Sequence, residues 1–185
     1  QEQTETARPA LLTLEDAKAL PLDRVRDLFG KHLNPGQLHF LKLLGFDEVL
    51  IKRAEGMYYY DQNDRPILDF FGGFGSLAYG HNHPRILAAR ARYQQEKRHE
   101  ICMAFMSQYA VALAHTPAAS PPAGLENVFL TTCGSVANEA ALKLAERYAG
   151  PKRATIAYAS NSFHGKTRAA LSMTDSQFYQ ADFTL

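Results

Sequence analysis

The sequence predicts an α/β fold, and two patterns carry this prediction. From residue 127 onward, short β-type runs alternate with amphipathic helical runs, as in a parallel sheet covered by helices. Between residues 49 and 70, three short β-type runs are separated by turn residues, which is typical of an antiparallel meander. The 185 residues are 46% hydrophobic and 21% charged, which is ordinary for a globular domain with its own core.

Residues 1–48 are expected to form a helical arm. The polar stretch 1–9 has no hydrophobic period and predicts disorder. Thr13–Asp16 resembles a capping box with Asp in place of Glu, and Gly30 is expected to end the second helix. The helices are expected at 13–20, 21–29 and 35–44, and Gly45 is expected to end the third. They suit either contact with a partner subunit or capping of their own domain.

The meander and the glycine-rich segment after it are expected to span residues 49–83. Strands are predicted at 49–54, 57–60 and 66–70. The run Gly73–Ala78 also fits the dinucleotide-binding pattern G-x-G-x-x-A. That pattern should lead directly into a long helix, whereas Pro84 restarts the helix here. A dinucleotide site is therefore the weaker interpretation.

Residues 84–185 carry the alternation of helices and strands. Its expected helices are 84–100, 107–115, 137–149 and 167–172, and its expected strands are 127–132 and 154–159. The alanine-rich apolar stripe of helix 137–149 predicts close packing against a sheet.

The turn between strand 127–132 and the following helix is a candidate phosphate site. A helix that starts there presents free N–H groups and the positive end of its dipole. Gly134 allows close approach of the backbone, Ser135 adds a hydroxyl donor, and Val136 offers a further N–H. An ordinary strand-to-helix turn has the same pattern, so this motif is weak by itself.

Phe163, His164 and Gly165 follow the next expected strand and form the second candidate site. An aromatic ring beside a glycine can serve as a flat platform, although in isolation Phe163 could equally be a core residue. A phosphate cradle and an aromatic platform together are what a planar phosphorylated cofactor requires.

These two segments, with Asp69–Gly75 and Gly80–Pro84, resemble the class III aminotransferases in order and spacing from about Leu50 onward. The resemblance implies the pyridoxal-phosphate transferase fold of type I. It further implies an arm at 1–48, a meander and substrate-entrance loop at 49–83, and the first half of the large, mostly parallel-sheet cofactor domain at 84–185. The Gly-Gly-Phe-Gly run at 72–75 is most similar to putrescine-type members.

The resemblance also implies a cofactor and site residues. Gly134, Ser135 and Val136 would bind the phosphate of pyridoxal 5′-phosphate, Phe163 would stack on its ring with His164 beside it, and Phe74 would contact the substrate. Ser135 and Val136 stand where the family commonly has other residues, but a valine keeps the backbone N–H. Glu139 would lie near the cofactor pocket or the dimer interface, or would simply pair with Lys143 on the surface.

The reaction implied is transfer of an amino group from an amine or ω-amino acid to a 2-oxo acid, through a cofactor aldimine and in ping-pong order, by a homodimer. The family's Schiff-base lysine and the aspartate that faces the pyridine nitrogen are expected downstream. No catalytic residue is therefore assigned within this chain, which is interpreted as an N-terminal portion. A non-catalytic fragment or interaction module is the alternative.

Charge and composition argue against several other classes of protein. The net charge of +1 favours neither nucleic acid nor an anionic membrane, and no apolar run approaches the roughly 20 residues that span a bilayer. Two cysteines, Cys102 and Cys133, indicate a reduced, cytoplasmic setting. The histidines His81, His83 and His99 lack further ligands at metal-binding spacing, and the first two are expected to fix the loop and cap the helix that starts at Pro84.

Overall fold

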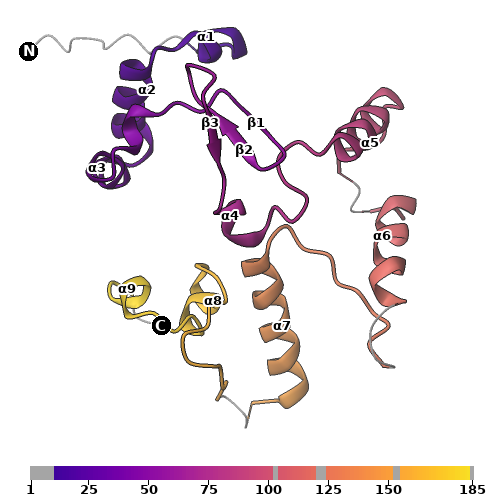
Figure 1. Ribbon diagram of the computed structural model, residues 1–185. Helices are drawn as coiled ribbons and strands as arrows, with labels where there is room; N and C mark the ends of the chain where they lie inside the picture. Colours follow the sequence, from indigo (N-terminus) through magenta and orange to yellow (C-terminus); the bar gives the residue numbers. More distant parts are fainter. Residues whose placement is uncertain (1–10, 102–103, 120–123, 152–154, 184–185) are drawn as a thin grey trace, which may run out of the picture. The chain divides into compact units, whose positions relative to one another are not determined.

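The chain folds into two compact units, Gln1–Arg98 and His99–Leu185. The computed structural model describes residues 11–101, 104–119, 124–151 and 155–183 (Figure 1). The expected disorder at 1–9, and Cys102, lie outside these ranges. No helix in the described part of the chain is long and apolar enough to cross a membrane.

Short helices open the first unit. They are α1 (Leu14–Ala19), α2 (Leu22–Leu28), the π-helix η1 (Phe29–Leu33), α3 (Pro35–Leu43) and the 3₁₀-helix η2 (Phe46–Glu48). The predicted capping box is confirmed, because Asp16 N–H donates to Thr13 Oγ1 at 3.1 Å and Thr13 N–H donates to Asp16 Oδ2 at 2.9 Å. Gly45 follows α3 in a left-handed conformation (φ 71°), as expected for a helix-ending glycine.

The expectation that Gly30 ends a helix is wrong. Gly30 lies inside η1, where the helical turn continues to Leu33. A Cβ at this position would lie 2.8 Å from Cδ2 of Leu38 in α3. The glycine therefore leaves room for the side chain of Leu38 and does not end a helix.

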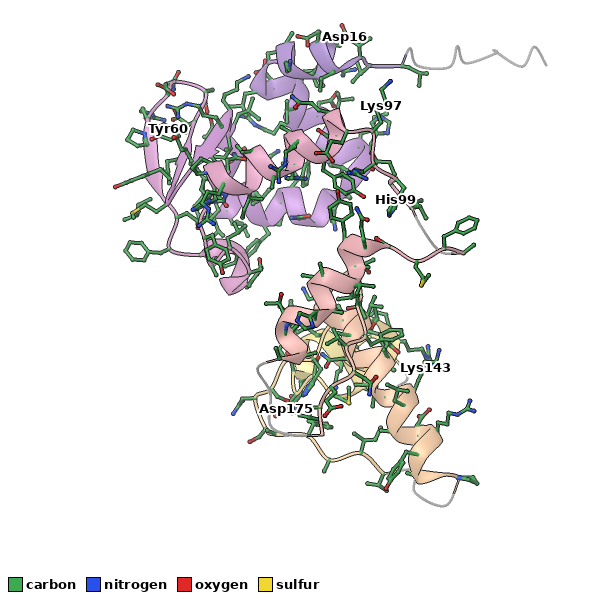
Figure 2. All side chains as sticks on the ribbon, turned by 90° about the vertical axis from the view of Figure 1, so that its right-hand side faces the viewer. Asp16, Tyr60, Lys97, His99, Lys143 and Asp175 are labelled. Atoms are coloured by element: carbon green, nitrogen blue, oxygen red, sulfur yellow. The ribbon has the colours of Figure 1, made fainter. Side chains whose placement is uncertain are left out.

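The meander of the first unit consists of β1 (Arg53–Glu55), β2 (Tyr58–Tyr60) and β3 (Pro66–Leu68), paired antiparallel in the order β1-β2-β3. The strands are shorter than predicted. Gly56 and Asp64 supply positive φ in the two turns (55° and 59°). The guanidinium of Arg53 lies over the ring of Tyr60, its cross-strand partner, 3.4 Å from the ring centroid. Tyr60 is labelled in Figure 2.

The glycine-rich segment forms one irregular helical turn, α4 (Gly72–Gly75), in which Gly73 and Phe74 have positive φ (58° and 56°). The chain then runs through a loop to α5 (Pro84–Gln95). The G-x-G-x-x-A pattern thus does not lead directly into a long helix, which a dinucleotide-binding turn requires.

The second unit contains α6 (Gln108–Ala118), α7 (Gly134–Ala149), α8 (Arg168–Ser172) and α9 (Gln177–Gln180). Helix α6 continues past the predicted end at His115 and includes Pro117. A proline is tolerated there because only the last turn loses a hydrogen bond, and Ala119 N–H still donates to His115 O at 3.1 Å.

The strands expected at 127–132 and 154–159 are not present among the described residues of the second unit. A strand is stabilised by ladder hydrogen bonds to a neighbour, and the two segments do not pair with each other or with another described segment. The packing predicted for α7 against a sheet is likewise absent: Leu144 is 61% and Tyr148 93% exposed. The buried apolar side chains described here are Ala170, Leu171 and Met173, around α8.

Candidate active site

The turn ahead of α7 offers unpaired hydrogen-bond donors. The helix begins at Gly134 after an extended Cys133, which makes no side-chain capping bond. The N–H groups of Gly134, Ser135 and Val136 therefore have no acceptor in the described part of the chain, and the first turn contains no acidic residue. A Cβ at Gly134 would meet no atom within 4 Å. The space over these donors is open to a ligand.

Gly165 brings the second candidate segment onto this turn. A Cβ added at Gly165 would lie 2.3 Å from Oγ and 3.0 Å from Cα of Ser135, so only a glycine permits this contact. Its φ of 132° is also a conformation that residues with a side chain rarely adopt. Phe163 precedes Gly165 by two residues, so this contact brings the segment that carries Phe163 onto the candidate phosphate turn. About thirty residues separate the two segments in sequence.

Two further side chains of α7 hold residues 163–174 against the start of this helix, an arrangement called the junction below. Asn138 Nδ2 donates to the carbonyl of His164 at 2.6 Å. Glu139 Oε1 accepts from Thr167 Oγ1 at 2.6 Å and from the amides of Ala169 and Ala170 at 3.0 and 3.2 Å. The surface ion pair considered for Glu139 is not found among the ion pairs of the described residues, and Glu139 Oε1 is instead taken up by these three donors. Sequence reasoning missed Asn138, whose position three residues after Ser135 places it on the same side of the helix.

Thr174 is the buried centre of the junction. Its hydroxyl, on a residue only 1% exposed, accepts from the amides of His164 at 3.0 Å and Gly165 at 3.2 Å. The same hydroxyl has two acceptors in reach, Gly165 O at 2.9 Å and Ala170 O at 3.1 Å. The ring of His164 is fixed as well, since Nδ1 donates to Met173 O at 2.8 Å. His164 is therefore a structural member of the junction.

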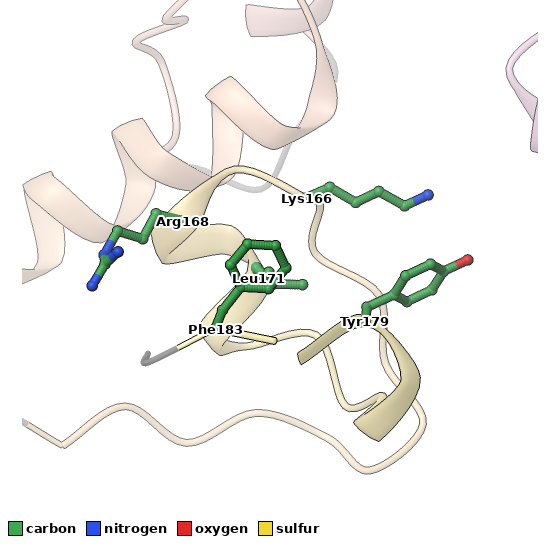
Figure 3. A pocket seen from close by; sticks show the side chains of 5 residues that line it. All are labelled: Lys166, Arg168, Leu171, Tyr179 and Phe183. Carbon is green, nitrogen blue, oxygen red and sulfur yellow. The ribbon is translucent and has the colours of Figure 1, made fainter. Parts of the chain in front are cut away.

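Phe163 presents its ring to solvent beside Tyr179. The residue is 62% exposed, and its ring meets that of Tyr179 edge-on with centroids 6.3 Å apart. Lys166 Nζ lies 4.4 Å from the centroid of Tyr179. An open pocket of about 360 Å³ is lined by Lys166, Arg168, Leu171, Tyr179 and Phe183. In Figure 3, Lys166 and Arg168 point in opposite directions, with Leu171 and Phe183 between them.

Phe74, the expected substrate contact, belongs to the other unit. It is 87% exposed and meets the ring of Phe71 at 4.0 Å between centroids. Asp69 holds the loop that carries it, because Asp69 Oδ1 accepts from the amides of Phe71 at 2.8 Å and Gly72 at 2.9 Å. The Gly72 amide, followed by a hydrogen bond from His81, keeps the pKa of Asp69 below its ordinary value.

The predicted roles of the loop histidines are confirmed. His81 Nε2 lies 2.8 Å from Asp69 Oδ2, and His83 Nδ1 accepts from Arg85 N–H at 3.3 Å at the start of α5. In the described ranges, no group of three or more His, Cys, Asp or Glu side chains is arranged to hold a metal ion.

The second unit therefore contains five of the six predicted site residues, and Gly165 joins the turn that carries Gly134 and Ser135 to the segment that carries Phe163 and His164. Val136 follows on the same helical turn, and Phe74 lies in the first unit. Free amides, a serine hydroxyl and an exposed aromatic ring are the donors and the surface that a flat phosphorylated ring requires. Residues 134–136 and 163 fit pyridoxal phosphate.

Comparison with known proteins points to one family. The aminotransferase class-III family matches residues 45–185, which is most of the chain. The chain is 33% identical over 175 residues to the aminotransferase PigE of a Serratia strain, covering 94% of this chain and 20% of PigE. It is 41% identical over 119 residues to the succinylornithine transaminase/acetylornithine aminotransferase of Pseudomonas aeruginosa, covering 62% of this chain and 29% of that protein.

The solved structures it resembles are transaminases. An (S)-enantioselective ω-transaminase from Thermomicrobium roseum has a TM-score of 0.73 at 29% identity, covering 88% of this chain and 37% of that one. An ω-transaminase from Pseudomonas jessenii in complex with PMP has a TM-score of 0.64 at 26% identity, covering 74% of this chain and 32% of that one.

The fold is accordingly that of the type I pyridoxal-phosphate transferases. The chain belongs to the class III aminotransferases. It spans less than a third of the length of the two curated relatives described above.

Proposed function

We propose that the protein carrying this chain is a pyridoxal-phosphate-dependent aminotransferase, and that residues 134–136 and 163 form part of its cofactor site. The observation that carries the proposal is the contact of Gly165 with Ser135, which joins the free amides of α7 to the segment bearing Phe163. Membership of class III and the PMP-containing structural relative support the choice of cofactor.

Each residue has a defined task in this proposal. The amides of Gly134, Ser135 and Val136 bind the phosphate at the positive end of the α7 dipole, and the Ser135 hydroxyl adds a further donor. Phe163 stacks on the ring and keeps it flat, at about 0.5–1.5 kcal/mol beyond the burial of its surface. Pyridoxal phosphate, when bound, is an electron sink that carries the amino group between two half-reactions in ping-pong order.

The amino donor we propose is an amine or ω-amino acid, and the acceptor a 2-oxo acid. The names of two relatives support this choice: one is a succinylornithine transaminase/acetylornithine aminotransferase, and the other a diaminobutyrate–2-oxoglutarate transaminase. The Gly-Gly-Phe-Gly run at 72–75 favours a putrescine-type donor, with Phe74 in contact with its carbon chain.

We place this enzyme in the cytoplasm as a homodimer. The exposed free thiol of Cys133 suits a reducing compartment. Gel filtration of the full-length protein, with a class III enzyme as the size standard, would measure the number of subunits.

The assignment of the phosphate site can be tested with two substitutions at Gly134. A Cβ there meets no protein atom, so both Gly134→Ala and Gly134→Asp are expected to fold. Gly134→Asp places a carboxylate over the amides and should abolish retention of pyridoxal phosphate by like-charge repulsion, whereas Gly134→Ala should retain most of it. Absorbance of the purified protein and its mass after borohydride reduction measure the bound cofactor.

Equal cofactor content in the Asp variant and in the unsubstituted protein would overturn the phosphate assignment. A protein that binds the cofactor but transfers no amino group from any diamine, ω-amino acid or amino acid would favour the non-catalytic interpretation instead.

A further inference from the structure

Helix α8 receives its N-terminal cap from a distant helix. Its own N-cap residue, Thr167, makes no side-chain capping bond to the helix. The second and third residues of α8, Ala169 and Ala170, instead donate their amides to Glu139 Oε1 at 3.0 and 3.2 Å, and the Thr167 hydroxyl donates to the same atom at 2.6 Å. These are the amides that a local Ser, Thr or Asp normally satisfies.

The carboxylate that caps α8 is rigidly tied to the phosphate turn. Glu139 follows Gly134 by five residues along α7, which is about 7.5 Å at the helical rise. On the other side, Thr167 follows Phe163 by four residues, and Gly165 between them packs on Ser135. Glu139 Oε1 thus connects α7, which begins with the phosphate turn, to the segment that carries Phe163.

The electrostatics agree with a charged carboxylate in this role. The Thr167 hydroxyl, then the amides of Ala170 and Ala169, hold the pKa of Glu139 below its ordinary value, and the positive charge of Lys143 acts in the same direction. Hydrogen bonds to an ionised acceptor are roughly twice as strong as neutral ones. Glu139 is consequently anionic at neutral pH and able to hold three donors at once.

We propose that Glu139 is a positioning residue that sets the distance between the phosphate turn and the aromatic ring of Phe163. This proposal rests on the proposed function, because it assigns Glu139 a role toward pyridoxal phosphate. Glu139 touches no part of the cofactor in this role. A ligand that needs both the turn and the ring requires Glu139, whereas a ligand that needs only the turn does not.

The test compares two ligands on the apo form of the full-length protein. Pyridoxal phosphate spans the turn and the ring, and inorganic phosphate occupies the turn alone. Glu139→Ala should raise the dissociation constant for pyridoxal phosphate by about 10-fold through loss of charge-assisted hydrogen bonds, and that for phosphate by less than about 2-fold. Fluorescence titration measures the first ligand, and competition by phosphate against it the second.

Two further variants and a control separate positioning from general damage. Glu139→Gln keeps an acceptor oxygen and should lose about 3-fold or less, and Thr167→Val removes one of the three donors from the opposite side and should lose a similar amount. Glu146→Ala, on an exposed position of the same helix, should bind both ligands as the unsubstituted protein does.

Two outcomes overturn the proposal while leaving the proposed function intact. One is an unchanged pyridoxal-phosphate affinity in Glu139→Ala, and the other is an equal loss for both ligands, which would mean only that the unit is less well folded. An unsubstituted protein that binds phosphate but not pyridoxal phosphate would overturn the proposed function, and the role of Glu139 with it.

Discussion

Two carboxylates, one in each unit, gather hydrogen bonds in similar numbers but over different distances in sequence. Asp61 accepts from the amides of Asn63 and Arg65 and from the Arg65 guanidinium, all within four residues. Glu139 accepts from Thr167, Ala169 and Ala170, which lie 28 to 31 residues away. The first carboxylate shapes a turn. The second fixes how two separate segments meet.

The same contrast separates the strands that form from those that do not. In the first unit, β1, β2 and β3 pair with their immediate neighbours in sequence, so short connections supply each partner. In the second unit, the strands predicted at 127–132 and 154–159 were expected in a parallel sheet, in which a long crossover connection must bring each strand to its partner. Local patterns therefore suffice for the meander and not for the parallel sheet.

The largest loss in the free energy of unfolding is expected from Gly165→Ala, at the centre of the junction. The new Cβ would overlap Ser135 and occupy a backbone conformation with φ 132° that favours glycine. Overpacking and backbone strain together should cost about 3 kcal/mol or more in the free energy of unfolding. Urea unfolding followed by circular dichroism measures this cost. Gly134→Ala, which meets no atom, is the matched control, and equal stability of the two variants would show that the contact is dispensable.

A smaller loss is expected from Thr174→Val. The valine keeps the shape of the side chain but leaves the part-buried amide of His164 and the buried amide of Gly165 without their acceptor. Leaving them unpaired should cost about 2 kcal/mol. Thr174→Ser retains the hydroxyl and should recover most of it. The prediction fails if serine and valine destabilise the protein equally in the same urea titration.

The smallest effect is expected for Asp61, the carboxylate with local partners, and it concerns how the stability of the protein depends on pH. Burial alone would raise the pKa of Asp61, but the Arg65 and Asn63 hydrogen bonds and the Arg65 charge outweigh it and lower the pKa below 3.8. A lowered folded-state pKa contributes stability that is present above the unfolded value and is lost as the pH falls through the folded one.

Asp61→Asn should accordingly lower the unfolding temperature at neutral pH and flatten its decline below about pH 4, compared with the unsubstituted protein. Parallel pH profiles for the two proteins in thermal unfolding would contradict this assignment. Glu139→Gln measured alongside would show whether the long-range carboxylate responds to acid in the same sense, since its pKa is lowered too.

What could be predicted from the sequence follows from the range of each interaction. The Thr13 capping box, the Gly45 helix end and the His83 cap are set by residues a few positions apart, and each is confirmed. The candidate pair of Gly134 and Phe163 was recognised from two local motifs whose meeting the structure then shows through Gly165.

The residues that hold those motifs together could not be predicted in the same way. Thr174 carries no local pattern, and its role depends on amides nine and ten residues earlier. Gly30 was misassigned because a helix-ending glycine and a glycine that admits a neighbouring Leu38 have the same sequence signature. Asn138 and Glu139 were placed on a helix, but their partners come from a segment whose position only the folded chain defines.

Gly165 has a consequence for how this region can vary. Every single-nucleotide change of a glycine codon that alters the amino acid adds a side chain or ends the chain, and at this position any side chain displaces Ser135. In a library selected for function, position 165 should return glycine alone, while position 134, where a Cβ meets nothing in the protein, should also return alanine. A glycine that tolerates no substitution marks a contact between two segments of the chain. A glycine that tolerates only alanine marks a place where the backbone contacts a ligand.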